Sequence, residues 1–330
     1  MNIKILLVSS IFYLVTYGVM PNNNQQSSVI SAKNMGLVSL AGLGIAYGTY
    51  SFVRYAAQIS PAKVDLVDFV LEDSKDHNAQ NSQNYLFAHG IASTHKQVGR
   101  YASFIENKNI FTYNFPDVTT RFWRVNFWHT ALGQSYEINY FKEAYGKAQI
   151  KLKSSSKIDK SLVLMGVSRG ATTILNFMAQ CQPQGVKALI LESPFDSTRS
   201  ITDNKITQWG LDFIPGMQNI GHVILSSLFW QHSRSGEQAL DSIELLDKNL
   251  PILLICSKQD TLVPASSTIT LYARLKAVGH KNTHIFIAEQ GKHGKILEGP
   301  DREHYQKAVH DFNQKYGIGV SAAQKQIVQH

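Results

Sequence analysis

The chain has 330 residues, of which 44% are hydrophobic and 17% are charged, with two cysteines and a net charge of +8. This composition excludes a disordered chain, and the length allows one large α/β domain or two small ones. Two cysteines cannot form a disulfide framework, and the scattered basic residues lack the interleaved aromatic residues of a nucleic-acid-binding surface.

The first 57 residues contain two uncharged runs. The first follows Lys4 and ends at residue 20, and it fits a signal peptide or a first membrane segment, although no A-x-A cleavage site follows. Residues 21–34 form a polar spacer. Residues 35–57 begin with a second uncharged run, just long enough to cross a bilayer, that contains a G-x-x-x-G pair. We expect an apolar helix there, either a membrane anchor or a buried soluble helix.

The charges around these runs leave the topology open. Lys33 lies between the runs, whereas Lys4 and Arg54 lie outside them. Removal of the first run would export the rest of the chain, free or tethered by the second run, whereas a hairpin of two spans would leave it in the cytoplasm. We favour export, with a catalytic domain outside the cytoplasm that is exported or membrane-associated.

From residue 58 to residue 330, strand patterns alternate with helix patterns. The expected strands lie within residues 63–73, 84–90, 109–115, 161–167, 186–193, 251–260 and 283–290. The expected helices lie within residues 94–107, 135–152, 169–180, 267–279 and 302–317. Strands with nearly continuous apolar runs, separated by helices, predict an α/β domain with a mostly parallel, doubly wound sheet covered by helices on both faces.

One interval, residues about 197–246, is far longer than a single helical connection requires. It is apolar and aromatic in places, and Trp209, Phe213 and Trp230 are candidate substrate or lid residues. Long connections are usually functional or carry their own helices. We expect a helical lid over a site, the alternative being a packed helical insertion that does not contact the substrate.

A G-x-S-x-G pattern follows the strand expected at residues 161–167. Ser168 stands at its centre, between Gly166 and Gly170, and a helix pattern begins directly after it. This is the context of a nucleophile elbow, where a sharp turn from strand to helix exposes the serine and the flanking glycines avoid collisions. The pattern therefore predicts a catalytic serine.

A serine needs a base, and the base needs an orienting carboxylate. Asp260 and His293 each follow a buried strand pattern, so both are expected at the edge of the sheet where Ser168 lies. Asp196 and Glu192, which follow the strand before, could replace the acid. His280 and His284 compete as the base, but both are expected at the opposite end of the sheet.

Two backbone N–H groups would hold the oxyanion of a tetrahedral intermediate. One comes from Arg169, directly after the serine. The other comes from the turn after Gly90, with Ile91 as the first choice and Ala92 as the second. Glycine at this turn would let the backbone approach the substrate, and the preceding His89 is expected to brace the turn.

These motifs resemble those of the α/β-hydrolase superfamily. "LFAHGI" resembles its oxyanion turn, "GVSRG" its elbow, "CSKQDTLVP" its acid loop and "QGKHGKI" its histidine loop. "ALILESPFDS" is similar to the branch of Bem46-like proteins, acyl-protein thioesterases and prolyl-oligopeptidase-like enzymes. The resemblance implies hydrolysis of an acyl bond without a metal or other cofactor. The chain departs from many relatives after "YNF", where an aromatic stretch makes Trp123 and Trp128 candidate substrate contacts.

Three functions are consistent with the sequence. The first is a serine hydrolase that cleaves an ester, thioester or lipid acyl bond through an acyl-enzyme, acting on a small molecule or a lipid and working near a membrane. The second is a serine peptidase of the oligopeptidase type. The third is a non-catalytic, membrane-associated binding protein that keeps the fold. Neither an H-E-x-x-H motif nor a Cys/His spacing typical of metal sites occurs in the sequence.

Overall fold

The computed structural model describes residues 64–69, 83–102, 108–118, 129–155 and 159–319. The chain divides into two units, Met1–Gln58 and Ile59–His330. The first unit lies outside the described residues, so the signal segment, the spacer and the apolar helix stay predictions. Among the helices that the structure describes, none is long and apolar enough to cross a membrane.

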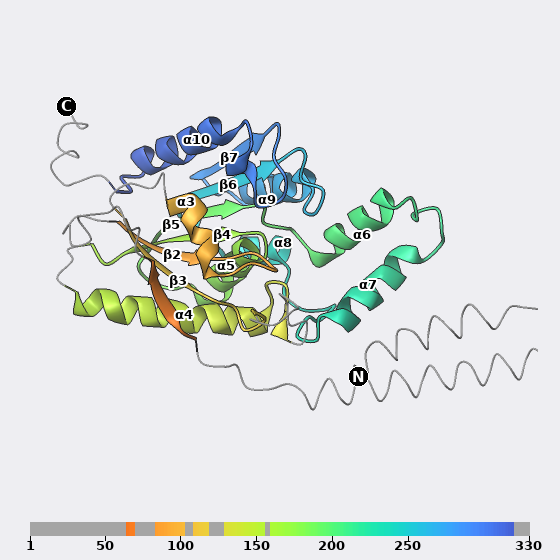
Figure 1. Cartoon of the computed structure of the whole chain (residues 1–330), viewed down its shortest axis with the longest axis horizontal. Coiled ribbons are helices and arrows are strands. Elements are labelled where there is room, and N and C mark those ends of the chain that lie inside the picture. Colours follow the sequence, from red (N-terminus) through yellow and green to blue (C-terminus); the bar gives the residue numbers. More distant parts are fainter. Residues whose placement is uncertain (1–63, 70–82, 103–107, 119–128, 156–158, 320–330) are drawn as a thin grey trace, which may run out of the picture. The chain divides into compact units, whose positions relative to one another are not determined.

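A seven-stranded sheet forms the centre of the described domain (Figure 1). The strand order is β1-β3-β2-β4-β5-β6-β7, with β1 antiparallel to β3 and all other neighbours parallel. The strands are β1 (Leu66–Phe69), β2 (Gln83–Ala88), β3 (Lys108–Tyr113), β4 (Leu162–Val167), β5 (Val186–Glu192), β6 (Ile252–Ser257) and β7 (Thr283–Ala288). The expected mostly parallel sheet is confirmed, and every expected strand is present among the described residues.

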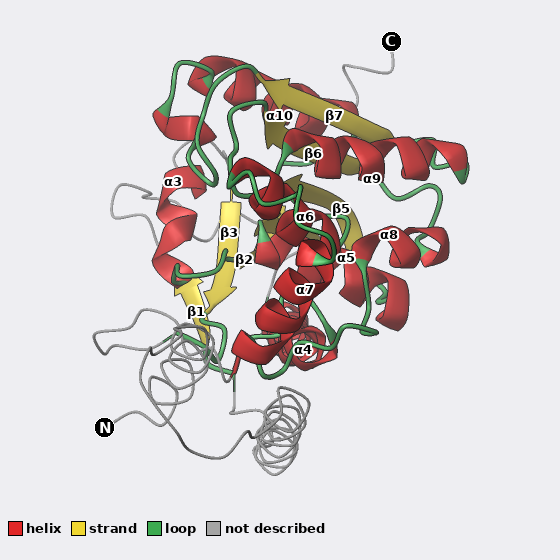
Figure 2. Ribbon diagram, turned by 90° about the vertical axis from the view of Figure 1, so that its right-hand side faces the viewer, coloured by secondary structure: helices red, strands yellow, loops and turns green. Residues whose placement is uncertain are grey.

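Helices cover both faces of this sheet, as the continuous apolar strands predicted (Figure 2). One face packs against α4 (Ser135–Ser154), α5 (Arg169–Cys181), α8 (Ala239–Ser242), η3 (Ile243–Leu245) and α9 (Ala265–Ala277). The other packs against η1 (His95–Val98), α3 (Gly99–Ala102), η4 (Ile296–Glu298) and α10 (Arg302–Lys315). Strands β2, β4 and β6 are buried along their whole length, because both of their faces meet a helical layer.

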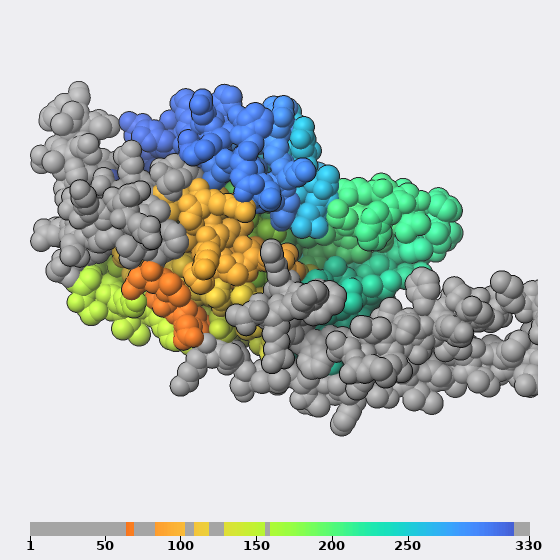
Figure 3. Space-filling view, viewed as in Figure 1, coloured from red at the N-terminus to blue at the C-terminus, as the bar shows by residue number. Residues whose placement is uncertain are grey.

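The long interval after β5 contains two helices of its own, α6 (Thr198–Gln208) and α7 (Met217–Leu228). They pack against each other, and they project from the body of the domain (Figures 1 and 3). A Cβ on Gly221 would lie 2.6 Å from Ile206 Cδ1, so the two helices approach closely at this glycine. We call α6, α7 and the loop between them the α6–α7 hairpin.

Candidate active site

The turn between β4 and α5 holds Ser168 in a strained conformation. Its φ of 54° and ψ of −119° are unfavourable for any residue with a side chain. A Cβ on Gly170 would lie 2.2 Å from Ala88 O, and one on Gly166 would lie 2.7 Å from Ala171 N. Both glycines are therefore required by contacts with backbone atoms, as the elbow pattern predicted.

Asp260 and His293 meet beyond the ends of β6 and β7. His293 Nδ1 lies 2.6 Å from Asp260 Oδ2, and the side chain of Asp260 is almost fully buried. The same Oδ2 accepts a hydrogen bond from Ser193 Oγ, while Oδ1 accepts from the N–H groups of Leu262 and Val263. Four partners thus fix this carboxylate, which in turn orients the imidazole.

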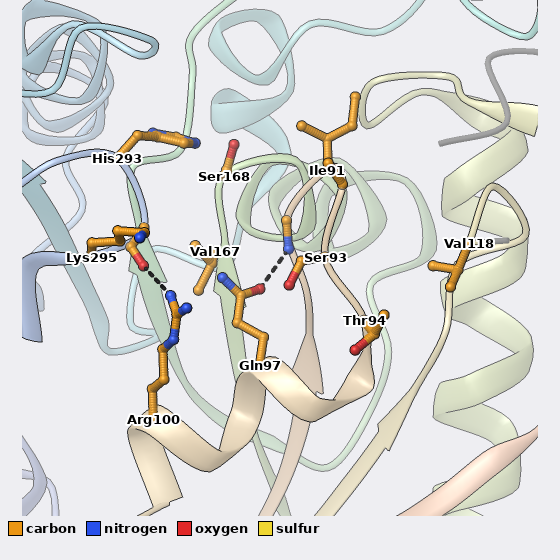
Figure 4. A pocket seen from close by; sticks show the side chains of 13 residues that line it. Ile91, Ser93, Thr94, Gln97, Arg100, Val118, Val167, Ser168, His293 and Lys295 are labelled. Atoms are coloured by element: carbon orange, nitrogen blue, oxygen red, sulfur yellow. Dashed lines mark hydrogen bonds between the residues drawn. The ribbon is translucent and has the colours of Figure 1, made fainter. Parts of the chain in front are cut away.

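Ser168 and His293 line one pocket of about 610 Å³. Figure 4 shows His293 and Ile91 on either side of Ser168, at the end of β4. The pocket wall includes several polar side chains and is formed by Gly90, Ile91, Ala92, Ser93, Thr94, Gln97, Arg100, Val118, Val167, Ser168, His293, Gly294 and Lys295. The three residues expected as nucleophile, base and acid are thus brought together at one edge of the sheet.

The turn after β2 is held by side chains from three directions. Gly90 N–H donates to Gln97 Oε1 at 2.9 Å, and Gly90 O accepts from Arg169 Nη2 at 3.3 Å. His89 Nδ1 lies 2.7 Å from Gly90 O, while its Nε2 accepts from Phe115 N–H at 3.0 Å. His89 must therefore carry its proton on Nδ1. Burial, with help from the charge of Arg169, lowers the pKa of His89 well below 6.5, so this histidine is a neutral brace.

Of the two expected oxyanion donors, Ile91 lines the pocket, and Arg169 directly follows Ser168, which lines it. Arg169 is the first residue of α5, where N–H groups have no partner within the helix. Ile91 and Ala92 both line the pocket, so the choice between them stays open. A Cβ on Gly90 would make only ordinary contact, 3.5 Å from Val167 O, so the protein does not itself require glycine there as it does in the elbow.

The side chain of Arg169 has a role that sequence reasoning missed. It is fully buried, and its Nη1 lies 2.6 Å from Asp117 Oδ1 and 3.4 Å from Glu137 Oε1. The guanidinium also lies over the ring of Phe115, 4.2 Å from its centroid. A buried arginine needs an acidic partner. The charge of Arg169 next to the elbow serine was therefore the sequence feature that could have indicated a buried ion pair. These contacts tie the segment after β3, α4, α5 and the turn after β2 together.

Glu192 is a second feature, which the sequence indicated only as a substitute for Asp260. Its backbone O accepts from Ser168 N–H at 2.7 Å. Its carboxylate is buried, and Oε2 accepts hydrogen bonds from the hydroxyls of Tyr101 and Tyr305, at 2.9 and 3.0 Å. Burial raises its pKa to about 7, against the opposing effects of the two tyrosines and of His293.

Asp196, His280 and His284 lie away from the pocket wall. Asp196 Oδ1 accepts from Ser267 Oγ at 2.5 Å and from two groups at the start of α6, so it stabilises a helix start. His280 lies before β7, and His284 lies near the beginning of that strand. Both histidines are at the opposite end of β7 from His293, as expected.

The aromatic candidates do not form the pocket wall. Trp209 and Phe213 are 70% and 77% exposed on the α6–α7 hairpin, and Trp230 is buried. None of the three lines the pocket, so their expected contact with a substrate stays a prediction. Trp123 and Trp128 lie outside the described residues.

The prolyl oligopeptidase family matches residues 123–317, which is more than half of the chain. The chain belongs to this family. The matched region includes Ser168, Asp260 and His293. Membership in the prolyl oligopeptidase family and the fold together class the chain as a serine-type hydrolase of the α/β-hydrolase superfamily, as the motifs predicted.

Similar proteins extend this finding to the fold. The uncharacterized protein YfhR of Escherichia coli (strain K12) is 26% identical over 151 residues, which is 46% of this chain and 44% of YfhR. An esterase of Pyrococcus furiosus superposes with a TM-score of 0.54 at 17% identity, over 76% of this chain and 91% of its own. An acylaminoacyl peptidase of Pyrococcus horikoshii superposes with a TM-score of 0.53 at 16% sequence identity, over 80% of this chain and 43% of its own length. At these identities the structures share the α/β-hydrolase fold.

Proposed function

We propose that this member of the prolyl oligopeptidase family hydrolyses an ester or thioester through an acyl-enzyme. Ser168 attacks the acyl carbonyl, and His293 takes the serine proton and returns it to the leaving group. Asp260 orients His293 and stabilises its charged form, while the N–H groups of Ile91 and Arg169 hold the oxyanion. Water then hydrolyses the acyl-enzyme, with His293 again as the base.

The observation that carries this proposal is that Ser168, His293 and Asp260 come together at one pocket. A strained serine between two obligatory glycines borders the same pocket as a histidine whose Nδ1 lies 2.6 Å from a buried aspartate. Backbone strain of this kind costs about 1–3 kcal/mol, and it persists where the surrounding structure over-determines it. A purely structural turn would not need it.

The substrate class follows from the pocket and the hairpin taken together. Ser93, Thr94 and Gln97 place polar groups in the wall beside Ser168, which favours a short acyl group there over a long lipid chain. The exposed apolar side chains of the α6–α7 hairpin support its role as a lid for apolar parts of the substrate that extend beyond this wall.

Labelling with a fluorophosphonate tests the proposal directly. We expect the wild-type protein to be labelled and Ser168→Ala not to be labelled. With p-nitrophenyl esters, activity should be highest for acetate and butyrate and should fall towards palmitate. Equal labelling of both proteins would remove Ser168 from the mechanism, and a folded wild-type protein that neither labels nor turns over any ester would favour a non-catalytic binding protein.

Peptide hydrolysis is the second candidate, because the chain belongs to the prolyl oligopeptidase family. The same three side chains would carry it, so mutation of the site cannot separate the two reactions. A panel of short N-acylated peptides and proline-containing peptides, compared with esters of the same acyl group, separates them. We expect kcat/KM to be larger for the esters by more than their intrinsic reactivity explains.

We also propose that the catalytic domain is exported or membrane-associated. The support is the pair of uncharged runs before residue 54 and the polar spacer between them. Fractionation of the expressing cells, followed by the mass of the mature N-terminus, tests this. Recovery of an intact N-terminus in the cytoplasmic fraction would contradict it.

A further inference from the structure

Glu192 is a buried acid that the proposed reaction does not use. It ends β5, beside Val167 of β4 in the register of the sheet. Its Oε2 accepts hydrogen bonds from Tyr101 of α3 and Tyr305 of α10, and both tyrosines are fully buried. Its Oε1 has no hydrogen-bond partner among the described residues. A buried carboxylate is costly, so a structural role alone would be better served by an amide or an apolar residue.

The position of Glu192 joins it to all three proposed catalytic residues. Its backbone O accepts from Ser168 N–H at 2.7 Å. The next residue, Ser193, has a positive φ of 47° and donates its hydroxyl to Asp260 Oδ2 at 3.1 Å. Asp260 in turn lies 2.6 Å from His293 Nδ1, and the charge of His293 lowers the pKa of the Glu192 carboxyl. One strand end therefore touches the nucleophile and the acid directly and acts on the base through space.

The charged groups around Glu192 are few, which makes its own charge effective. His293 and Asp260 act on it directly, with opposite signs. Arg100 and Glu298 lie near Tyr101 and form an ion pair with each other at 3.1 Å, so their charges largely cancel. In surroundings of low dielectric constant, a negative charge on Glu192 favours a positive charge on His293.

We propose that Glu192 is a positioning residue whose buried carboxylate stabilises the protonated form of His293. His293 becomes protonated when it takes the proton of Ser168, so Glu192 supplements Asp260 at that step without transferring a proton itself. Because its pKa is raised to about 7, the carboxylate is mostly neutral at pH 6 and mostly charged at pH 8.5. The contribution of Glu192 therefore grows with pH.

The test uses Glu192→Gln in the full chain, with kcat/KM for p-nitrophenyl acetate measured from pH 5.5 to 9. The inference rests on the proposed function, so ester hydrolysis and fluorophosphonate labelling of the wild-type protein come first. We expect the acidic limb to move only slightly to lower pH, because the carboxylate that the variant lacks is mostly neutral at pH 6. The activity should fall about 3–10-fold at pH 8.5 and little at pH 6.

Glu289→Gln is the matched control, because Glu289 is a highly exposed carboxylate just beyond β7 that pairs with Lys258 on the surface. It should leave the pH profile unchanged. A Glu192→Gln profile that keeps the wild-type shape, or falls by one factor at every pH, would overturn the inference while leaving the proposed function intact. A wild-type protein without ester hydrolysis would instead overturn the proposed function.

Tyr305→Phe gives an independent test if Glu192→Gln fails to fold. Loss of the Tyr305 hydroxyl removes a hydrogen bond that favours the charged carboxylate, so the pKa of Glu192 should rise further. We expect lower activity than wild type between pH 7 and 8, with recovery at higher pH. Recovery at alkaline pH would support an electrostatic role, and a loss that does not depend on pH would overturn it.

Discussion

Two parts of the chain lie at the same end of the sheet and differ in almost every physical respect. Around Ser168, side chains are buried, glycines are required by backbone contacts and each polar group of Asp260 has a partner. On the α6–α7 hairpin, four apolar side chains of α7 are at least 42% exposed, and Trp209 and Phe213 are more exposed still. The conformation of the first region is fixed by many contacts, so we call it over-determined. The conformation of the second is fixed by few contacts.

Under the proposed function, this contrast separates the residues of the reaction from those proposed to meet the substrate. A triad needs geometry fixed to a fraction of an ångström, which only a packed and hydrogen-bonded surrounding can supply. A surface that meets varied apolar groups needs exposed area and few internal constraints. We therefore expect substitutions in the first region to change activity or stability strongly, and substitutions in the second to change only the preference among substrates.

The largest effect is expected from Asp260→Asn. The amide keeps the shape of the side chain but presents a donor to His293 and cannot stabilise its charged form, so kcat should fall by about 10⁴-fold. Steady-state hydrolysis of p-nitrophenyl acetate measures this. Asp196→Asn is the control, since Asp196 also follows a strand of the sheet but accepts hydrogen bonds that stabilise the start of α6. An equal loss in both variants would contradict the assignment of Asp260.

Gly170→Ala tests how tightly the elbow is fixed. The new Cβ would lie 2.2 Å from Ala88 O, so either β2 or α5 must move. We expect a loss of about 3 kcal/mol or more in the free energy of unfolding, measured by urea denaturation. Gly146→Ala in α4, where a Cβ meets nothing within 4 Å, should instead gain about 0.5–1 kcal/mol. Similar values for the two variants would contradict the packing of the elbow.

The over-determined region is also the region that the sequence predicted best. Ser168, Asp260 and His293 follow buried strands, and apolar runs of strand length are visible in the sequence because both faces of those strands are covered. The same reasoning placed His284 at the far end of the sheet. Local pattern was sufficient here because parallel strands share one carboxyl edge.

Prediction failed where a residue's role depends on a partner far away in the sequence. The sequence indicated a role only for the N–H of Arg169, because no residue near it in the sequence indicates that its side chain pairs with Asp117 and Glu137. It indicated Glu192 only as a substitute acid, because the two tyrosines that hold it are 91 and 113 residues away. The sequence also did not indicate that Trp209 and Phe213 are exposed on the α6–α7 hairpin, because hydrophobicity alone does not distinguish an exposed residue from a buried one.

Glu192→Gln should also change how stability depends on pH. The pKa of Glu192 is about 7 in the folded protein, above its ordinary 4.5, so the folded state binds this proton more tightly than the unfolded state. Its contribution to stability is full below pH 4.5 and is lost as pH rises towards 7, by on the order of 3 kcal/mol in total. The variant lacks this loss.

Urea denaturation at pH 5 and pH 8 measures the difference. We expect the stability of Glu192→Gln relative to wild type to improve between these two pH values, because only the wild-type protein loses the stability that the proton on Glu192 supplies. Glu289→Gln should show no such change, because its side chain is 68% exposed. A relative stability that is the same at both pH values would contradict the raised pKa of Glu192.

The smallest effects are expected from Trp209→Ser and Phe213→Ser on the hairpin. Both side chains are at least 70% exposed, so the free energy of unfolding should change by no more than about 0.5 kcal/mol. Hydrolysis of p-nitrophenyl acetate should be unchanged, while that of the decanoate should fall a few-fold if the hairpin meets the acyl chain. Ile206→Ala, a buried position of the same hairpin, should cost about 2–4 kcal/mol. Unchanged decanoate hydrolysis in both serine variants would remove the hairpin from substrate binding.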